Sequence, residues 1–190
     1  MCVVSSPMSR DNRLSIFLCY ILRHNPGSIG LTLDSDGWAS VNSLMDCCSR
    51  DGRVFDLITL RRIVATDTKG RYSLDGDRIR ANQGHSIDKR PSFEQVVPPD
   101  RLFHGTSDSF ITSILANGLN RGQRHHVHLS TDIDTAKKVG ARRGTSVILE
   151  IKAREMSDCG VPFFLSTNNV WLVDHVPPAF LSIASGVEPL

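Results

Sequence analysis

The chain has 190 residues but only 5 lysines, against 17 arginines, and its five cysteines contain no Cys-x-x-Cys pair. An odd number of cysteines without that spacing argues against a disulfide framework and against a structural zinc site. No apolar run approaches the ~20 residues that span a bilayer, and the N-terminus lacks the basic start and apolar core of a signal peptide. We therefore expect a cytoplasmic protein with reduced thiols and no membrane partner.

The preference for arginine is more informative than the net charge of +2, which is too small for nucleic-acid binding by bulk attraction. The planar guanidinium grips phosphate or carboxylate with two hydrogen bonds, whereas lysine is a hydrated point charge. A compositional bias of an arginine-rich proteome would give the same excess. With 40% hydrophobic and 22% charged residues, the composition predicts one or two globular domains.

Residues 1–84 have the pattern of a helical lobe that ends in a β-hairpin. Apolar residues recur at helical spacing from Leu14 to Arg23, and Pro26 ends this helix because proline disfavours helix in the residue before it. A second helix begins near Val41, and a third is expected from Leu57 to Thr66. Residues 71–81 predict a hairpin. Helices followed by a hairpin are typical of a winged helix.

Residues 85–99 lack periodicity, and their prolines and charges indicate a linker. Residues 100–190 then alternate short strands with helices. Strands are expected at Arg101 to His104, Val127 to Ser130, Val147 to Ile151, Phe163 to Leu165 and Val170 to Val173, and helices at Phe110 to Ala116 and Asp132 to Val139. The predicted fold class is α+β, that is mixed α/β, in two lobes.

One short segment, Arg124 to Ser130, gathers an arginine and three histidines on a strand-like element. Side chains alternate along an extended chain, so Arg124, His126 and His128 would share one face, and that face could meet a nucleotide. Solvated edge residues around one hydrogen-bonded core histidine would explain the pattern equally well.

The pair Arg23-His24, at the end of the first predicted helix, puts a permanent cation beside a titratable proton donor. Such a pair suits holding a phosphate and protonating a leaving group. Capping of the helix dipole, worth ~0.3–1 kcal/mol, is the alternative. Arg71, at the start of the hairpin, is either a third phosphate ligand or a solvated residue of the wing.

A second polar group, His104-Gly105-Thr106-Ser107, follows a predicted strand and precedes a predicted helix. Backbone N–H groups, hydroxyls and an imidazole at such a strand exit can bind the ribose or phosphate of a dinucleotide. No Gly-x-Gly-x-x-Gly or Walker loop is present, which argues against a Rossmann dehydrogenase and a P-loop ATPase. A zinc site of His104, His126 and His128 lacks any accompanying ligand pattern, so we expect no metal.

Several of these motifs recur together in one known family. They are Leu22-Arg23-His24-Asn25-Pro26, Asp36-Gly37-Trp38, Gly70-Arg71-Tyr72, Ile79 to Ser86, Leu102 to Thr106, Arg124 to Ser130, Asn169-Val170-Trp171-Leu172 and Asp174 to Pro178. In this order the chain resembles the RNA 2′-phosphotransferase family, the KptA-type enzymes first associated with tRNA splicing. The resemblance runs from about Leu14 to Leu181, through both halves.

The resemblance implies a winged-helix-like lobe at 1–84 that binds RNA and phosphate. It also implies an ADP-ribosyltransferase-like lobe at 100–190 that binds NAD, with the active site in the cleft between the lobes. In the implied reaction, an internal 2′-phosphate of a tRNA-like RNA attacks the anomeric carbon of the nicotinamide ribose and expels nicotinamide. The ribose 2″-hydroxyl then attacks the phosphorus, which releases the RNA 2′-hydroxyl and ADP-ribose 1″,2″-cyclic phosphate. No metal is needed.

The family's essential Arg-His, Arg and Arg correspond to Arg23, His24, Arg71 and Arg124. Three guanidiniums would fix the 2′-phosphate, and the histidine would either protonate the departing 2′-oxygen or donate a hydrogen bond to the phosphate. The expected cofactor-binding residues, with the first of them facing a ribose, are His104, Gly105, Thr106, Ser107, His128, Leu129 and Ser130.

Two other functions stay open. The same fold could ADP-ribosylate terminal phosphates of nucleic acid, or another small phosphate, without completing the transfer. Alternatively, the chain could be a non-catalytic winged-helix nucleic-acid-binding protein that senses NAD. That protein would read a duplex through residues 57–66, where Arg61 and Arg62 are the only obvious basic contacts. We expect a monomer, because no exposed apolar seam is evident.

Overall fold

The computed structural model describes residues 9–87, 92–141 and 145–184. Within these residues the fold is mixed α/β, as predicted, with six α-helices and several small sheets. The chain divides into two compact units, Met1–Ser92 and Phe93–Leu190. The division falls inside the predicted linker, of which residues 88–91 lie outside the described part. That the units are winged-helix-like and ADP-ribosyltransferase-like lobes, and that the protein is a monomer, stay predictions.

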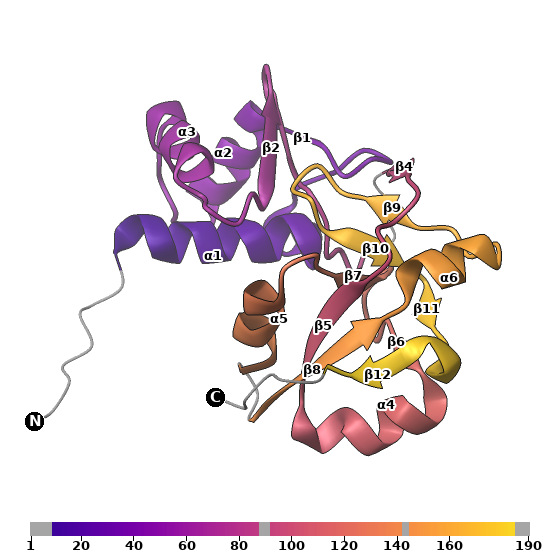
Figure 1. Cartoon of the computed structure of the whole chain (residues 1–190). Helices are drawn as coiled ribbons and strands as arrows, with labels where there is room; N and C mark the ends of the chain where they lie inside the picture. The colour runs from indigo at the N-terminus through magenta and orange to yellow at the C-terminus, as the bar shows by residue number, and fades with distance from the viewer. Residues whose placement is uncertain (1–8, 88–91, 142–144, 185–190) are drawn as a thin grey trace, which may run out of the picture. The chain divides into compact units, whose positions relative to one another are not determined.

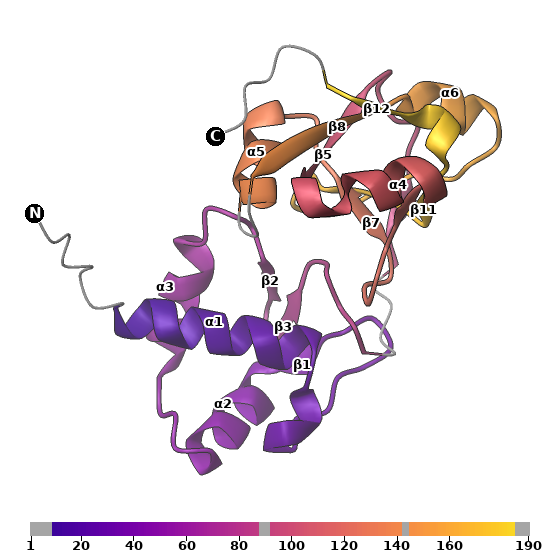
Figure 2. The ribbon, with the colours of Figure 1, turned by 90° about the horizontal axis from the view of Figure 1, so that it is seen from below.

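The first unit packs three helices against a small antiparallel sheet of order β1-β3-β2. Figure 1 shows α2 and α3 above α1, and in the view of Figure 2 α1 runs between them. Its elements are α1 (Arg10–Arg23), η1 (Pro26–Ile29), β1 (Ala39–Ser40), α2 (Val41–Arg50), α3 (Leu57–Ala65), β2 (Tyr72–Asp75) and β3 (Arg78–Ala81). One apolar core, which includes Leu18, Leu22, Leu44, Leu60 and Ile79, joins the helices to the sheet.

The three predicted helices and the hairpin of this unit are confirmed, with one change of boundary. Helix α1 begins at Arg10 rather than at Leu14, because the side chain of Ser9 accepts a hydrogen bond from the backbone N–H of Asn12 and caps the first turn. The helix ends at Arg23, and Pro26 begins the 3-10 turn η1. The C-terminal end of α1 therefore carries Arg23 and His24, as expected.

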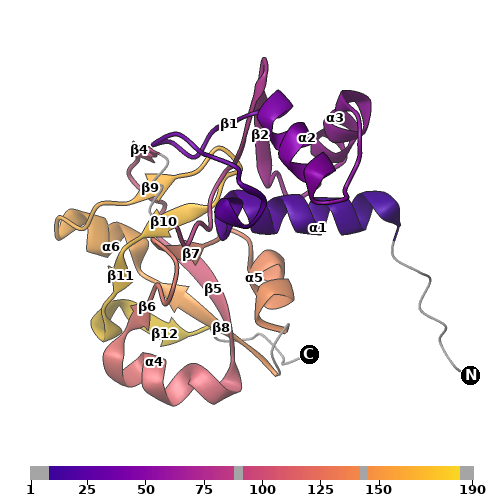
Figure 3. The ribbon, with the colours of Figure 1, turned by 180° about the vertical axis from the view of Figure 1, so that it is seen from behind.

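The second unit contains three antiparallel sheets, of orders β4-β9-β10-β7, β12-β8-β5 and β11-β6. Figure 3 shows α5 beside β5. The strands are β4 (Glu94–Gln95), β5 (Leu102–Ser107), β6 (Leu119–Asn120), β7 (Val127–Leu129), β8 (Ser146–Ile151), β9 (Phe164–Leu165), β10 (Trp171–Val173), β11 (His175–Val176) and β12 (Leu181–Ile183). The helical segments are η2 (Asp108–Phe110), α4 (Ile111–Asn117), α5 (Ile133–Gly140), α6 (Ala153–Asp158) and η4 (Pro178–Phe180).

A single bridge connects two of these sheets. Phe103 of β5 donates to the carbonyl oxygen of Ser130 at 2.7 Å and accepts from the Ser130 N–H at 2.9 Å. Ser130 directly follows β7, and β5 and β7 belong to different sheets. The bridge consequently sets His104, next to Phe103, beside the residues that precede Ser130.

Two expectations about this unit are wrong. His104 to Ser107 do not form a strand exit, because β5 continues to Ser107. Gly105 is needed there for packing, since a Cβ on it would lie 1.7 Å from the carbonyl oxygen of Ala136 in α5. Within the segment Arg124 to Ser130, only Val127–Leu129 is a strand, and Arg124 to His126 form bends. The alternation of side chains between two faces of a strand therefore does not extend back to Arg124.

The described part of the chain contains no helix long and apolar enough to cross a membrane. The same residues contain no group of three or more His, Cys, Asp or Glu side chains that could hold a metal ion.

Candidate active site

Arg23 occupies the last turn of α1, and its guanidinium lacks acceptors. The Nε and Nη2 atoms are buried, and neither has a hydrogen-bond partner among the residues that the structure describes. Leaving a buried charged donor unsatisfied costs free energy, and a bound anion would remove that cost. An anion beside these two nitrogens would satisfy them.

His24, at the C-cap of α1, contacts a segment that sequence reasoning did not include in the site. Its Nδ1 lies 2.9 Å from the hydroxyl oxygen of Ser86, and the Ser86 N–H donates to the carbonyl oxygen of Arg23 at 3.0 Å. The ring of Tyr20 lies 5.9 Å from the His24 ring. Ser86 thereby joins the chain after β3 to the end of α1 and helps orient the imidazole.

Arg71 is held by a buried carboxylate. Its Nε and Nη2 lie 2.9 Å and 2.7 Å from Oδ1 of Asp67, whose side chain is only 2% exposed, and Nη2 also donates to the Ser15 hydroxyl at 3.3 Å. Burial acts to raise the pKa of Asp67, but hydrogen bonds from Arg71 outweigh it and the pKa is lowered. The pKa of Arg71 is raised by the hydrogen bond to Asp67. Both groups are charged, and Asp67 fixes the guanidinium.

The Arg71 guanidinium contacts α1 on the stretch of helix that leads to the Arg23-His24 pair. Ser15, which Arg71 contacts, precedes Arg23 by about two helical turns, or ~12 Å along the helix axis. A pocket of about 160 Å³ lies at this place, and Ser15, Asp67, Lys69 and Arg71 are among the residues that line it. Polar space for a ligand therefore exists on the Arg71 side of the helix.

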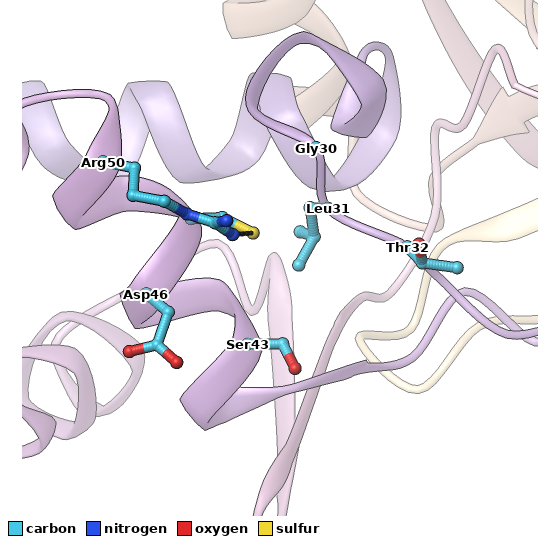
Figure 4. A pocket seen from close by; sticks show the side chains of 7 residues that line it. Gly30, Leu31, Thr32, Ser43, Asp46 and Arg50 are labelled. Carbon is cyan, nitrogen blue, oxygen red and sulfur yellow. Dashed lines mark hydrogen bonds between the residues drawn. The ribbon is translucent and has the colours of Figure 1, made fainter.

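A second pocket of the first unit, of about 230 Å³, contains none of the predicted site residues. It lies between η1 and α2, and Figure 4 shows Arg50 and Asp46 projecting from α2 beside it. The Arg50 guanidinium donates to the thiol sulfur of Cys47 at 3.1 Å. None of the residues that line this pocket also lines the pocket beside Arg71.

His104 lies in the middle of β5 and is partly buried. Its Nδ1 lies 2.9 Å from the carbonyl oxygen of His128, and because a carbonyl only accepts, Nδ1 carries the hydrogen. Burial lowers the pKa of His104 despite that hydrogen bond, and the Arg124 charge adds to the shift. The imidazole is therefore neutral, and its Nε2 is an acceptor suited to a hydroxyl group.

Arg124 and His128 form a pair, as expected, and the ring of His126 packs beside two phenylalanines. Arg124 Nη1 lies 2.8 Å from Nδ1 of His128 and donates to it, so His128 carries its hydrogen on Nε2. The ring of His126 contacts Phe93 and Phe164, with centroids 5.9 Å and 5.8 Å away. Phe164 and His128 both lie opposite Leu172 in the sheet and therefore share one face, so the contact with Phe164 is compatible with the predicted common face of Arg124, His126 and His128, which stays a prediction.

The other cofactor candidates are mostly engaged within the fold. Leu129 and Thr106 are buried, and Gly105 lies against α5. The Ser107 hydroxyl donates to the Asp108 carboxylate at 3.0 Å. The Ser130 hydroxyl accepts from the N–H of the residue two positions later, at 3.0 Å. His104, His128 and Arg124 therefore supply most of the available polar chemistry of this unit.

The comparisons with known proteins agree on one family. A family model described as RNA 2′-phosphotransferase, Tpt1/KptA family, matches residues 9–175. Proteins named "Probable RNA 2′-phosphotransferase" from Hahella chejuensis, Burkholderia lata and Escherichia coli K12 are 49%, 48% and 47% identical to the chain over 171, 180 and 170 residues. These alignments cover 89%, 92% and 88% of the chain, and 92% of each relative.

Proposed function

The chain belongs to the RNA 2′-phosphotransferase family, and on this premise we propose that it is an NAD-dependent transferase acting on an internal 2′-phosphate of RNA. The proposed products are RNA with a free 2′-hydroxyl, nicotinamide and ADP-ribose 1″,2″-cyclic phosphate. The first unit handles the RNA phosphate in this proposal, and the second handles NAD. Arg23, His24, Arg71 and Arg124 are the proposed catalytic residues.

The observation that carries the proposal is the Arg23 guanidinium, two of whose nitrogens are buried without a partner in the described residues. Two oxygens of a phosphate would accept from these two nitrogens in the bidentate geometry that arginine favours. The charge that develops on a phosphoryl group during transfer would strengthen these hydrogen bonds, so Arg23 would stabilise the transition state more than the ground state.

His24 is proposed to act on the 2′-oxygen that leaves the phosphorus. With Nδ1 at the Ser86 hydroxyl, the ring is oriented so that Nε2 can carry the proton for that oxygen. Ser86 is then a positioning residue, because it acts through the imidazole. The same arrangement supports a role for His24 as a hydrogen-bond donor to the phosphate, and the two roles differ in which step slows after substitution.

The second unit fits the sugar of a dinucleotide. NAD would supply the anomeric carbon that accepts the phosphate and the 2″-hydroxyl that completes the transfer. The unprotonated Nε2 of His104 would accept a hydrogen bond from a ribose hydroxyl, while Nε2–H of His128 would donate one. Arg124, which orients His128 through Nδ1, would place its positive charge near the reacting phosphate.

The direct test is an incubation of the purified protein with a short RNA that bears one internal 2′-phosphate, with and without NAD. Mass analysis of the RNA and of the nucleotide products follows. We expect loss of the phosphate only when NAD is present, together with ADP-ribose cyclic phosphate. An Arg23→Ala variant is the matched negative control, and Arg13→Ala, a change at an exposed arginine of the same helix, should keep the activity.

The same experiment separates the competing functions. Stable ADP-ribosylated RNA without phosphate release, or preferred modification of an RNA with only a terminal phosphate, would favour the ADP-ribosyltransferase function. Absence of any product, with tight binding of duplex nucleic acid, would favour the NAD-sensing binding protein. Arg61→Ala should then weaken that binding, whereas it should leave phosphotransfer unchanged under our proposal.

A further inference from the structure

The sheet of the first unit presents a tryptophan and two arginines on the face opposite its core. Ile79 and Ala81 of β3 are fully buried, so Arg78 and Arg80, which alternate with them, lie on the other face. The Cζ atoms of Arg78 and Arg80 lie 5.1 Å and 4.6 Å from the centroid of the Trp38 ring. Both distances fall within the range of a cation–π contact.

The two guanidiniums differ in how far the protein satisfies them. Nε of Arg80 is buried and has no hydrogen-bond partner in the part of the chain that the structure describes. Arg78 contacts the Asp75 carboxylate at 3.3 Å, but the two side chains are 49% and 68% exposed, and such surface pairs contribute little. Nε of Arg80 lacks an acceptor among the described residues, and Arg78 can exchange its carboxylate for another anion at small cost.

This group of residues continues the sheet from Arg71. In the β2–β3 register, Arg80 lies opposite Ser73, and Ser73 is two residues after Arg71 in the chain. Arg78 lies opposite Asp75. Residues two apart on a strand are separated by ~6.6 Å, which suits two successive phosphates of a nucleic-acid strand. The contacts with the Trp38 ring already restrict the two arginine side chains, so binding of a phosphate costs little further side-chain entropy.

We propose that Trp38, Arg78 and Arg80 form a platform for the phosphodiester backbone of the RNA that flanks the 2′-phosphate. The platform rests on the proposed function for the identity of its ligand. It contacts phosphates and not base edges, so it contributes affinity for longer RNA without sequence preference. The Asp75 carboxylate contacts Arg78, and the incoming backbone displaces it.

The test compares two substrates in the wild type and in an Arg78→Gln/Arg80→Gln variant. One substrate is a 2′-phosphorylated dinucleotide, which is too short to reach the platform, and the other carries the same dinucleotide inside a single-stranded RNA of about ten nucleotides. We expect KM for the longer RNA to rise roughly tenfold in the variant, with kcat unchanged. KM for the dinucleotide should stay the same.

Salt dependence of RNA binding gives a readout that needs no turnover. Each lost phosphate contact lowers the slope of log Kd against log salt by ~0.7 for a single strand, so the variant should lose about 1.4. Binding is measured by fluorescence anisotropy without NAD. If wild-type protein binds the longer RNA but does not turn it over, the proposed function fails while the platform is still tested by these slopes.

Three controls decide the outcome. Arg61→Gln removes an exposed arginine of α3 and should change neither KM nor the slope. Trp38→Phe keeps a ring beneath the guanidiniums and should retain most of the affinity that Trp38→Leu loses, with thermal unfolding checked for each. The platform is excluded if the double variant weakens binding of the dinucleotide as much as binding of the longer RNA, or if it weakens binding of neither. It is also excluded if Arg61→Gln weakens RNA binding as much as the double variant does.

Discussion

The polar groups of the two units are satisfied in opposite ways. In the first unit, two nitrogens of the Arg23 guanidinium are buried without a hydrogen-bond partner among the described residues, and Arg71 is charged and bound to the buried Asp67. In the second unit, His104 is neutral and bonded to a backbone carbonyl, and Arg124 donates to a second imidazole. The first arrangement suits an anion that completes the site. The second suits a ligand with hydroxyl groups, which needs oriented donors and acceptors more than charge.

The largest effect should come from Arg23→Ala. Loss of its contacts with the phosphoryl group should lower kcat by roughly 10²–10³-fold, as for other groups that stabilise transition-state charge. The free energy of unfolding should change by less than about 1 kcal/mol, because the two buried nitrogens make no hydrogen bond in the described structure. Single-turnover kinetics and chemical denaturation measure the two quantities. A large loss of stability with normal turnover would show that Arg23 is a structural residue.

Arg124→Ala should come next, with a loss of roughly 100-fold in phosphate removal and an intact fold. Arg124 lies at the surface of its unit, and its removal also frees His128 to change tautomer. Arg121→Ala is the matched control, because Arg121 lies three residues away and donates only to a backbone carbonyl. Equal activity of the two variants would remove Arg124 from the site.

Asp67→Asn should have a moderate effect on both activity and stability. Without the carboxylate, Arg71 loses its fixed orientation, and kcat/KM should fall about tenfold. The pKa of Asp67 is lowered in the folded state, so its ionised form stabilises the fold fully above about pH 5, and this stabilisation is lost as the pH falls below the ordinary value of 3.8 and through the lowered pKa of the folded state. The variant should therefore be less stable at pH 7 by about 1–3 kcal/mol, and the difference should shrink as the pH falls through that lowered pKa. Urea unfolding at several pH values checks this.

The smallest effect concerns the pH dependence of NAD binding. The pKa of His104 lies below its ordinary 6.5, so the imidazole should stay neutral as the pH falls past that value. KM for NAD should be constant from pH 8 to pH 6.5 and rise only below it, and His104→Ala should raise KM at every pH. A midpoint at or above 6.5 would contradict the neutral tautomer that we assign to His104.

Local patterns were sufficient for much of the first unit. The apolar spacing of α1, the proline after it and the turn between β2 and β3 are local signals, and each predicted its element. Asp67 and Ser86 were missed as parts of the site. Asp67 matters because it holds Arg71 four residues away, and Ser86 because the chain returns to α1 after β3. Nothing in the neighbouring sequence indicates either contact.

The second unit was less predictable because long-range packing decides its local structure. Gly105 has the appearance of a turn residue, but it permits the close approach of α5 to β5. The polar run at Arg124 to Ser130 has the alternation of a strand, but only its last part pairs with β10. Sequence reasoning named Arg124, His128 and His104, and the structure adds the hydrogen bonds that link Arg124 to His128 and His104 to the His128 carbonyl.

The bridge between Phe103 and Ser130 also bears on when, during folding, the His104 side chain reaches its hydrogen-bonded state. The tautomer of His104 depends on the His128 carbonyl, which reaches it only after two segments distant in the chain have paired. Closing the loop between these segments costs conformational entropy before the contacts that it allows are formed, so we expect this pairing late in folding. A partly folded chain would have the imidazole without its fixed proton, which makes the titration of His104 a reporter of completed folding.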